Sequence, residues 1–308
     1  MRILLTGAGG NLGRAAIPAL EAAGHELRLF DFRAVPTKHQ FLEGDVRDPV
    51  AVAQAAEGVD AVIHGAALHG VHLDTWSSSD FWSTNASGTF NVYNAARSAG
   101  VQRLVLASSM VVYGHVGGGS HRWGVVTEES PIDPADVYGL TKVVAEDVAR
   151  FHANVHQIST VALRLGMFVP ETFERYGMRL LFGGVDDRDV GQAVALALTH
   201  EPVDRFAAFN IMADSGLTGD DVSDLDADVV TVLERRWFGV SELAREHGID
   251  LVDSVWGRLL FPVDRAKRDL GYQPRYDFSA FVAAWRRGDP SHYPYADEPW
   301  WGVERPPQ

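Results

Sequence analysis

The sequence predicts an α/β fold with one doubly wound parallel sheet and a smaller second lobe. Short apolar runs alternate with amphipathic stretches through the first half of the 308 residues, which is typical of parallel strands joined by helices. Glycine-rich or polar turns follow several of the apolar runs. After about residue 165 the alternation loosens, which indicates a separate lobe.

The first strand is expected at residues 3–5, and a helix is expected to begin about four residues after Gly7. Gly7, Gly10 and Gly13 are spaced three apart. Gly7 permits the tight turn out of the strand, and Gly10 lets the backbone approach a pyrophosphate with no Cβ in the way. Gly13 lets the helix lie close to the strand. The turn therefore has the features of a dinucleotide-binding loop.

The helix after this turn directs free N–H groups and a partial positive charge toward phosphates, and Asn11 and Leu12 are assigned to the same site. Pro18 should kink this helix. The next strand ends at Asp31, 18 residues after Gly13, near the roughly 20-residue offset of a ribose-binding carboxylate. The alternative is an ordinary strand–turn–helix unit with a surface aspartate.

The other elements of the first half follow in chain order. Strands are expected at 60–64, 103–107 and 160–164, and helices at 51–56, 81–100 and 138–154. Together with the first two strands they complete a sheet of the Rossmann type, with helices on both faces.

The composition excludes several classes of function. With 27 Lys and Arg against 41 Asp and Glu, the net charge is −14, which argues against nucleic acid or an anionic membrane as the main partner. There is no cysteine, hence no disulfide, thiolate zinc site or cysteine nucleophile. No apolar run approaches the roughly 18 residues of a membrane span. The N-terminus has no signal-peptide layout, so the cytoplasm is the expected compartment.

A second informative stretch runs from Asp136 to Lys142. Tyr138 and Lys142 are four residues apart and share one helix face. A lysine ammonium near a phenol lowers the tyrosine pKa from about 10, which gives an acid/base for a substrate hydroxyl or carbonyl. This spacing is common by chance, but here it follows a strand that ends in Ser108 and Ser109.

Taken together, the motifs form an ordered series. It comprises Gly7-x-x-Gly10-x-x-Gly13, Asp31, Asp45-Val46, His64-Gly-Ala-Ala67, Asn85-x-x-Gly88-Thr89, Ser108-Ser109-x-x-Val112-Tyr113-Gly114 and Tyr138-Gly-x-Thr-Lys142, then Leu163 to Pro170, Asp189 to Ala193 and Asp264 to Pro274. This series closely resembles the extended short-chain dehydrogenase/reductase family, which includes the NAD-dependent epimerase/dehydratases. The resemblance covers about residues 1–285.

The resemblance implies three catalytic residues. Tyr138 would be the acid/base, and Lys142 would lower its pKa and bind the nicotinamide ribose. Ser109 would hydrogen-bond the reacting oxygen, in preference to Ser108. Asn85 matches a family asparagine of structural and relay use, although an ordinary helix asparagine is an equal alternative.

The resemblance also implies the cofactor contacts. Asp31 would bind the adenine ribose and repel a 2′-phosphate, which favours NAD over NADP, although Arg33 offers an alternative site for that phosphate. Asp45 and Val46 match the adenine contact, and Ala66 would line the cofactor with its neighbour Ala67.

The substrate region departs from the nucleotide-sugar members of the family. Only 24 residues separate Arg164 from Asp189, which resembles the shorter layout of uronate dehydrogenases. Arg175 is similar in position to their carboxylate-binding arginine and is expected to be either an anion clamp or a solvated loop residue. Met110 stands where those enzymes have polar substrate contacts, which counts against a uronate.

The expected function is an NAD-dependent oxidoreductase that transfers hydride between a sugar or sugar-like alcohol and the nicotinamide. The first alternative is an NAD-dependent sugar or nucleotide-sugar epimerase, and the second is a non-catalytic dinucleotide sensor. Homodimerisation through the two long helices is expected from the family. The histidines of loops 68–80 and 115–125 have no standard metal-ligand spacing, so no metal site is predicted.

The expected division places an NAD-binding domain at 1–165, to which the chain returns at about 189–212. Residues 166–188 and 213–285 would form the substrate lobe, with 166–187 mostly in loops. Residues 286–308 form a tail rich in proline and aromatic residues, expected to strap onto the body or a partner subunit. Three glycines at 117–119 suggest a mobile segment.

Overall fold

The computed structural model describes residues 1–114, 122–255 and 257–298, and at its centre lies a parallel sheet of seven strands. The strands are β1 (Arg2–Thr6), β2 (Glu26–Asp31), β3 (Gln40–Glu43), β4 (Ala61–His64), β5 (Arg103–Ser109), β7 (Ser159–Leu165) and β8 (Phe206–Ile211). Their order across the sheet is β3-β2-β1-β4-β5-β7-β8, so the direction of winding reverses between β1 and β4. The predicted Rossmann-type fold class is confirmed.

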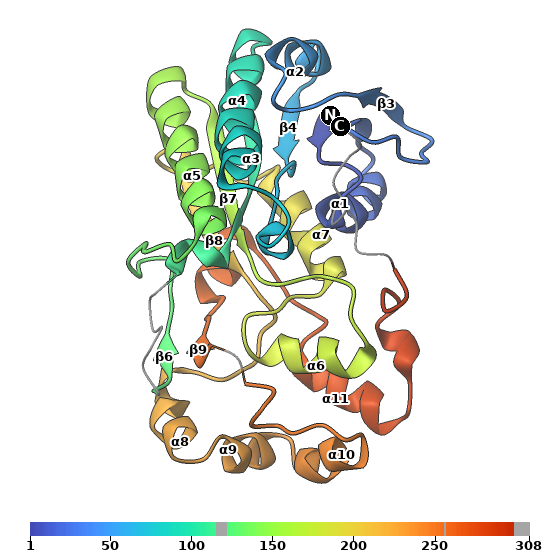
Figure 1. The fold of residues 1–308 in the computed structure, drawn as a ribbon, viewed down its shortest axis with the longest axis vertical. Helices are drawn as coiled ribbons and strands as arrows, with labels where there is room; N and C mark the ends of the chain where they lie inside the picture. The colour runs from blue at the N-terminus through green and yellow to red at the C-terminus, as the bar shows by residue number, and fades with distance from the viewer. Residues whose placement is uncertain (115–121, 256, 299–308) are drawn as a thin grey trace.

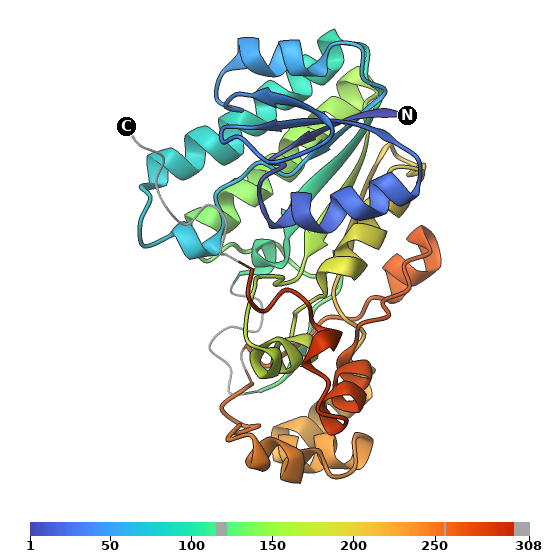
Figure 2. The same cartoon turned by 90° about the vertical axis from the view of Figure 1, so that its right-hand side faces the viewer.

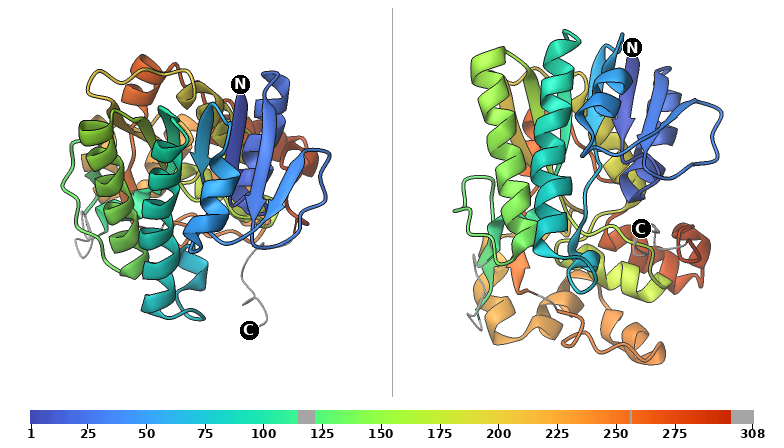
Figure 3. Two further views of the ribbon diagram at one scale, coloured as in Figure 1. Left: turned by 90° about the horizontal axis from the view of Figure 1, so that it is seen from above. Right: turned by 45° about the horizontal axis from the view of Figure 1, so that its top comes forward.

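Helices cover both faces of the sheet, as Figures 1 and 3 show. One face carries α1 (Asn11–Ala22) and α7 (Asp187–Ala197), and the other carries α2 (Pro49–Ala56), α4 (Gly88–Ser98) and α5 (Val137–His156). Neighbouring residues of a strand point to opposite faces. Ile3 and Leu5 accordingly pack with the first group of helices, and Leu4 packs with the second. Burial on both faces explains why these strands are continuously apolar.

The long helix expected at 81–100 consists of three parts. It begins as α3 (Ser78–Phe81), continues as a π-helical segment, η2 (Trp82–Ser87), and ends as α4. The Thr89 hydroxyl, in the first turn of α4, donates to the Asn85 carbonyl in the π-helical segment. Short π-helical segments occur frequently at functional sites, and this one carries the buried Asn85.

The second lobe lies beyond the carboxyl ends of the strands (Figure 1). It contains α6 (Phe173–Leu181), α8 (Val222–Ala227), α9 (Val229–Arg236), α10 (Val240–Glu246), α11 (Phe278–Arg286) and the short pair β6 (Gly124–Val125) and β9 (Leu259–Leu260). It has its own core, built around aromatic residues of α6 and α11. The aromatic residues of α6 and α11 thus form a cluster separate from the sheet core, whereas Val263, Ala266, Leu270 and Tyr272 pack in the sheet core.

The helix α6 corrects the expectation of loops at 166–187. Gly177 at its middle weakens the helical signal, because glycine is among the poorest helix formers. In the structure Gly177 faces α11, and a Cβ there would lie 2.0 Å from Cζ of Phe281. The glycine thus permits close contact between the two helices, and tertiary packing overrides the local propensity.

A segment after α11 crosses from the second lobe toward the sheet (Figure 2). It passes through the single turn η6 (Pro290–His292), and the Tyr293 ring stacks on Tyr176 at 3.9 Å between centroids. The Tyr293 hydroxyl donates to the Val169 carbonyl at 3.1 Å. This segment straps onto the body of its own chain, while Trp300 and Trp301 of the expected tail, and the glycines 117–119, lie outside the described residues.

Among the residues that the structure describes, no helix is long and apolar enough to cross a bilayer.

Candidate active site

A cavity of about 430 Å³ opens where β1, β4, β5 and β7 end. We call the part beside the ends of β2 and β3 the adenosine end; Asp31 and Asp45 line it. We call the opposite part the reaction end; it is lined by residues of 68–76, 107–111, Tyr138, Lys142 and 165–169. Parallel sheets bind ligands at this edge, next to the point where the winding reverses.

The three glycines of the first turn have different surroundings. Gly7 has a positive φ of 71°, and a Cβ on it would lie 2.5 Å from the Ala66 nitrogen. A Cβ on Gly13 would lie 1.9 Å from the Ala8 carbonyl oxygen. At Gly10 the nearest heavy atom is the Gly7 carbonyl oxygen, at 3.4 Å. Gly7 and Gly13 are thus required by the fold itself, whereas Gly10 leaves open space in the cavity.

The start of α1 fits a phosphate group. Its N-cap residue, Gly10, provides no side-chain cap, so the first N–H groups lack the usual partner. Asn11 and Leu12 line the cavity, and the buried Asn11 Oδ1 has no hydrogen-bond partner. Uncapped N–H groups at a positive helix end are suited to a pyrophosphate.

The adenosine end holds a fixed carboxylate. Asp31 is buried, and its two oxygens accept hydrogen bonds from the Gly9 N–H at 2.9 Å and the Arg33 N–H at 3.1 Å. The Asp45 carboxylate is paired with the Arg47 side chain. Both carboxylates line the cavity, as do Val46 and Ala66. The predicted cofactor residues that border the cavity therefore lie close to one another. Their carboxylates are suited to ribose hydroxyls and the helix N–H groups to a pyrophosphate, so the residues present fit a dinucleotide.

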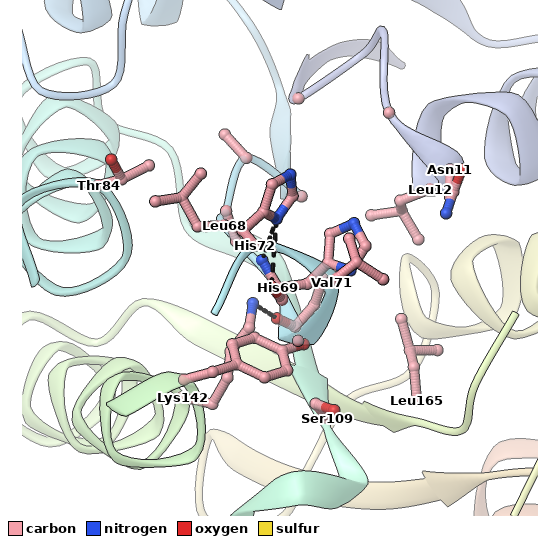
Figure 4. A pocket seen from close by; sticks show the side chains of 18 of the residues that line it. Asn11, Leu12, Leu68, His69, Val71, His72, Thr84, Ser109, Lys142 and Leu165 are labelled. Atoms are coloured by element: carbon pink, nitrogen blue, oxygen red, sulfur yellow. Dashed lines mark hydrogen bonds between the residues drawn. The ribbon is translucent and has the colours of Figure 1, made fainter. Parts of the chain in front are cut away.

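The three predicted catalytic residues meet at the reaction end. Ser109 is the last residue of β5, and its hydroxyl lies close enough to Tyr138, in the second position of α5, to lower the pKa of the phenol. Asp136 caps that helix by accepting a hydrogen bond from the Gly139 N–H at 2.7 Å. The Lys142 ammonium donates to the Ala107 carbonyl at 2.8 Å (Figure 4). The capped first turns of α5 hold the phenol and the ammonium on one side of the cavity.

The acid–base properties of this group differ from the expectation. Burial raises the pKa of Tyr138 to about 12, although the hydrogen bond with Ser109 acts in the opposite direction. Burial also lowers the pKa of Lys142 to about 8, against the effect of Glu146. The Lys142 Nζ lies 5.8 Å from the centroid of the Tyr138 ring and is bonded to a carbonyl. Burial therefore has the largest influence on the Tyr138 pKa, and the expectation that Lys142 lowers the phenol pKa stays a prediction.

A buried ion pair behind the site was missed by the sequence analysis. The Glu146 carboxylate accepts two hydrogen bonds from the Arg164 guanidinium, each 2.9 Å long, and one from the Ser108 hydroxyl at 2.6 Å. The Ser108 hydroxyl is therefore bonded to Glu146. Ser109 is the serine that lies beside Tyr138. The available signals were a glutamate one helical turn after Lys142 and an arginine inside an apolar strand.

Asn85 connects the loop after β4 to the catalytic helix. Its side-chain oxygen accepts a hydrogen bond from the Leu68 N–H at 2.7 Å, and its amide nitrogen donates to the Leu68 carbonyl at 2.8 Å and to the Thr141 hydroxyl at 3.0 Å. Nearby, the buried His64 ring is hydrogen-bonded to two threonines, Thr6 and Thr89. Asn85 therefore has a positional role that fixes the wall of the cavity.

The residues predicted to face the substrate divide into two groups. His69, His72 and Trp76 line the cavity, and Figure 4 shows both histidines in the same close-up as Ser109 and Lys142. Arg175, the predicted anion clamp, is exposed on α6 and does not line the cavity. Arg179, one turn later, is buried instead, and its guanidinium is bonded to the carbonyls of Met167 and Val169. The structure therefore does not bring the expected arginine to the site.

The chain is similar to known enzymes. The model of the NAD dependent epimerase/dehydratase family matches residues 3–186. A uronate dehydrogenase of Pseudomonas syringae pv. tomato is 34% identical over 212 residues, which cover 64% of this chain and 74% of that protein. An L-arabinose 1-dehydrogenase (NAD(P)+) of Haloferax volcanii is 33% identical over 54% of this chain and 66% of that protein.

Solved structures share the fold. A short-chain dehydrogenase/reductase superfamily protein of Agrobacterium tumefaciens with bound NAD has a TM-score of 0.68 at 24% identity, covering 94% of this chain and 98% of that one. A UDP-galactose 4-epimerase has a TM-score of 0.69 at 22% identity, covering 97% and 100%. The family model covers more than half of the chain, and the similar dehydrogenases agree with it. The chain is therefore an enzyme of the NAD dependent epimerase/dehydratase family, and its cofactor is NAD.

Proposed function

We propose that this enzyme oxidises one hydroxyl of a free sugar or sugar-like alcohol with NAD. The observation that carries the proposal is the meeting of Ser109, Tyr138 and Lys142 at one end of a cavity whose other end fits a dinucleotide. The similar dehydrogenases act on uronates and on L-arabinose by their names, which supports a sugar substrate.

In the oxidation, the Tyr138 phenolate takes the proton of the substrate hydroxyl while a hydride leaves the same carbon, and the carbon–oxygen bond becomes a carbonyl. Bound NAD supplies the nicotinamide carbon that accepts the hydride. Ser109 hydrogen-bonds the reacting oxygen and favours the ionised phenol. Lys142 supplies positive charge to the same side of the cavity. Asp31 would hold the adenine ribose, and the start of α1 would hold the pyrophosphate.

An epimerase is the second candidate, because several curated relatives are UDP-glucose 4-epimerases. The one of Corynebacterium glutamicum is 28% identical over 53% of this chain. The same residues would serve a hydride step that is reversed on the other face of the sugar. Cofactor that stays bound through purification, with no net change in absorbance on adding sugar, would favour the epimerase. A non-catalytic sensor is less well supported, since all three catalytic residues are present.

The test is Tyr138→Phe, which removes only the phenolic oxygen. Turnover, followed at the reduced-nicotinamide absorbance band, is expected to fall by about 10²–10⁴-fold, the usual contribution of a positioned acid/base. NAD affinity, measured by protein fluorescence, should stay within about threefold, because the variant keeps the ring. Tyr295→Phe, outside the cavity lining, is the matched control. Unchanged turnover in Tyr138→Phe contradicts the assignment of the acid/base.

We also propose a homodimer and a cytoplasmic location. The apolar side chains that support a dimer lie on η2, α4 and α5 and are 44–57% exposed: Trp82, Phe90, Leu140, Phe151 and Val155. An exposed apolar stripe of this kind is typical of an interface. Light scattering should give twice the chain mass, and Phe151→Asp should give the monomer. The cytoplasmic location is supported by the cysteine-free sequence, which needs no oxidising compartment.

The division into an NAD-binding domain and a substrate lobe is part of the same proposal. The cofactor residues come from the sheet unit, whereas 165–169 carry the chain toward the second lobe and line the reaction end.

A further inference from the structure

The reaction end is mainly apolar. Apart from the catalytic residues, its lining includes Val71, Met110, Phe168 and Val169. Among the described residues that line the whole cavity, the cationic side chains other than histidine are Arg33, Arg47 and Lys142. The two arginines lie at the adenosine end, where Arg47 is paired with Asp45. Lys142 is therefore the one described lysine or arginine at the reaction end.

The four arginines between residues 164 and 188 are directed elsewhere. Arg164 is paired with Glu146, Arg179 with Glu171 at 2.7 Å, and Arg188 with Asp186 at 2.8 Å. Arg175 is exposed on α6, outside the cavity lining. Within residues 164–188, no arginine is thus directed to the site as a bidentate partner for a carboxylate.

His69 does not supply the missing charge. His69 has its pKa lowered to about 3 by burial, with His72 and Lys142 acting in the same direction. The His72 ring lies against the His69 backbone, whose N–H donates to His72 Nδ1 at 2.9 Å. At neutral pH the His69 ring is therefore an uncharged hydrogen-bonding group, suited to a hydroxyl.

The electrostatic environment of the reaction end disfavours an anionic substrate. Transfer of a carboxylate from water to a largely apolar cavity costs several kcal/mol unless a cation pairs with it, and the ammonium of Lys142 already donates to the Ala107 carbonyl. The chain also carries a net charge of −14. An uncharged sugar avoids this cost: its C–H faces can pack on Val71, Phe168 and Val169, and its hydroxyls can bond to Ser109, Tyr138 and His69.

We propose that the substrate is an uncharged monosaccharide or polyol, in contrast to the uronate of the similar dehydrogenases. This inference rests on the proposed function, since it concerns the substrate of the same site.

The experiment compares pairs of sugars that differ only in charge: glucose with glucuronate, and galactose with galacturonate. The initial rate of NAD reduction gives kcat/KM for each, at pH 7 and constant ionic strength. In at least one pair the neutral member is expected to be favoured by about tenfold or more, which corresponds to about 1.4 kcal/mol. A UDP-hexose is included as the anionic nucleotide sugar.

Arg175→Ala is the diagnostic variant, because its side chain is exposed and outside the cavity lining. It should leave kcat/KM unchanged for both members of a pair. A selective rise of KM for the uronate in this variant would show that Arg175 closes over the site as an anion clamp, and would overturn the inference.

The outcomes separate the two levels of the proposal. Faster oxidation of a uronate, abolished by Tyr138→Phe, refutes the neutral substrate and leaves the dehydrogenase intact. If NAD is bound but no sugar leads to NAD reduction, the proposal of a free-sugar dehydrogenase is itself refuted. Oxidation of a neutral sugar with at least tenfold preference supports both.

Discussion

The two ends of the cavity are built in different ways. At the adenosine end, the backbone itself forms the site. Gly7 and Gly13 permit a turn that side chains would block, and two backbone N–H groups donate hydrogen bonds to the Asp31 carboxylate. At the reaction end, side chains from three distant segments converge, among them Ser109 and Tyr138. A site that is formed by one backbone turn has its residues close together in the sequence, so a short motif predicts it. A site that is formed by loops from distant segments has no such motif.

The largest expected effect comes from the glycines of the first turn. Gly13→Ala places a Cβ 1.9 Å from the Ala8 carbonyl oxygen, so the turn must shift and NAD affinity should fall by about 100-fold or more, with a loss of stability of about 1–3 kcal/mol. Urea unfolding and fluorescence titration with NAD measure the two quantities.

Gly10→Ala is the matched variant, since its Cβ would meet only the Gly7 carbonyl oxygen, at 3.4 Å. It should weaken NAD binding without loss of stability, because the methyl group occupies open space beside the start of α1. Equal destabilisation by the two variants would contradict the distinction between packing and ligand space.

The next effect concerns Lys142. Because burial lowers its pKa from 10.5 to about 8, the folded protein carries the cost of a buried ammonium below pH 8. Between pH 8 and 10.5 the unfolded chain binds the extra proton, so this cost is relieved as the pH rises. Lys142→Met should therefore abolish turnover and raise the free energy of unfolding at pH 7 by about 1–3 kcal/mol, after the lost bond to Ala107 is counted.

The gain from Lys142→Met should shrink by about half or more at pH 9.5, as the linkage relation requires. Chemical denaturation of the variant and the parent at the two pH values measures it. A gain that stays constant between pH 7 and 9.5 would show that the Lys142 charge is not the source of the instability.

The smallest effect is expected from Asp31→Asn, which removes the charge and keeps one acceptor oxygen. NAD affinity should fall by about tenfold, consistent with the loss of one charge-assisted hydrogen bond. The preference for NAD over NADP should fall as well, because Arg33 lines the same end. Comparison of kcat/KM with the two cofactors measures the change. A preference for NAD as strong as in the parent would show that Asp31 does not exclude the 2′-phosphate.

The sheet and the adenosine end were predictable from sequence because their signals are local. The alternation of strands and helices gave the fold class, and Gly7, Gly10, Gly13 and Asp31 lie within one strand–helix–strand unit. Ser109, Tyr138 and Lys142 were found through their spacing and order.

The rest depended on contacts between distant residues. The helix α6 has a glycine at its centre that only the packing of Phe281 explains. The pairing of Glu146 with Arg164 joins a helix to a strand, and neither residue alone signals it. Arg175 matched by position in the sequence, but the helix that carries it turns it outward. The spacing of residues in the sequence predicts which of them share a helix or strand. It does not predict the direction in which a segment between the two lobes places its side chains.

The strap has a consequence for the timing of assembly. A chain is synthesised from its N-terminus, and the last strand of the sheet ends at Ile211. Tyr293, which holds Val169 at the wall of the cavity through its hydroxyl, is made 82 residues later. On the ribosome the sheet can therefore form well before the wall of the reaction end is secured, so a nascent chain would acquire its cofactor loop first and its complete substrate pocket among the last events of folding.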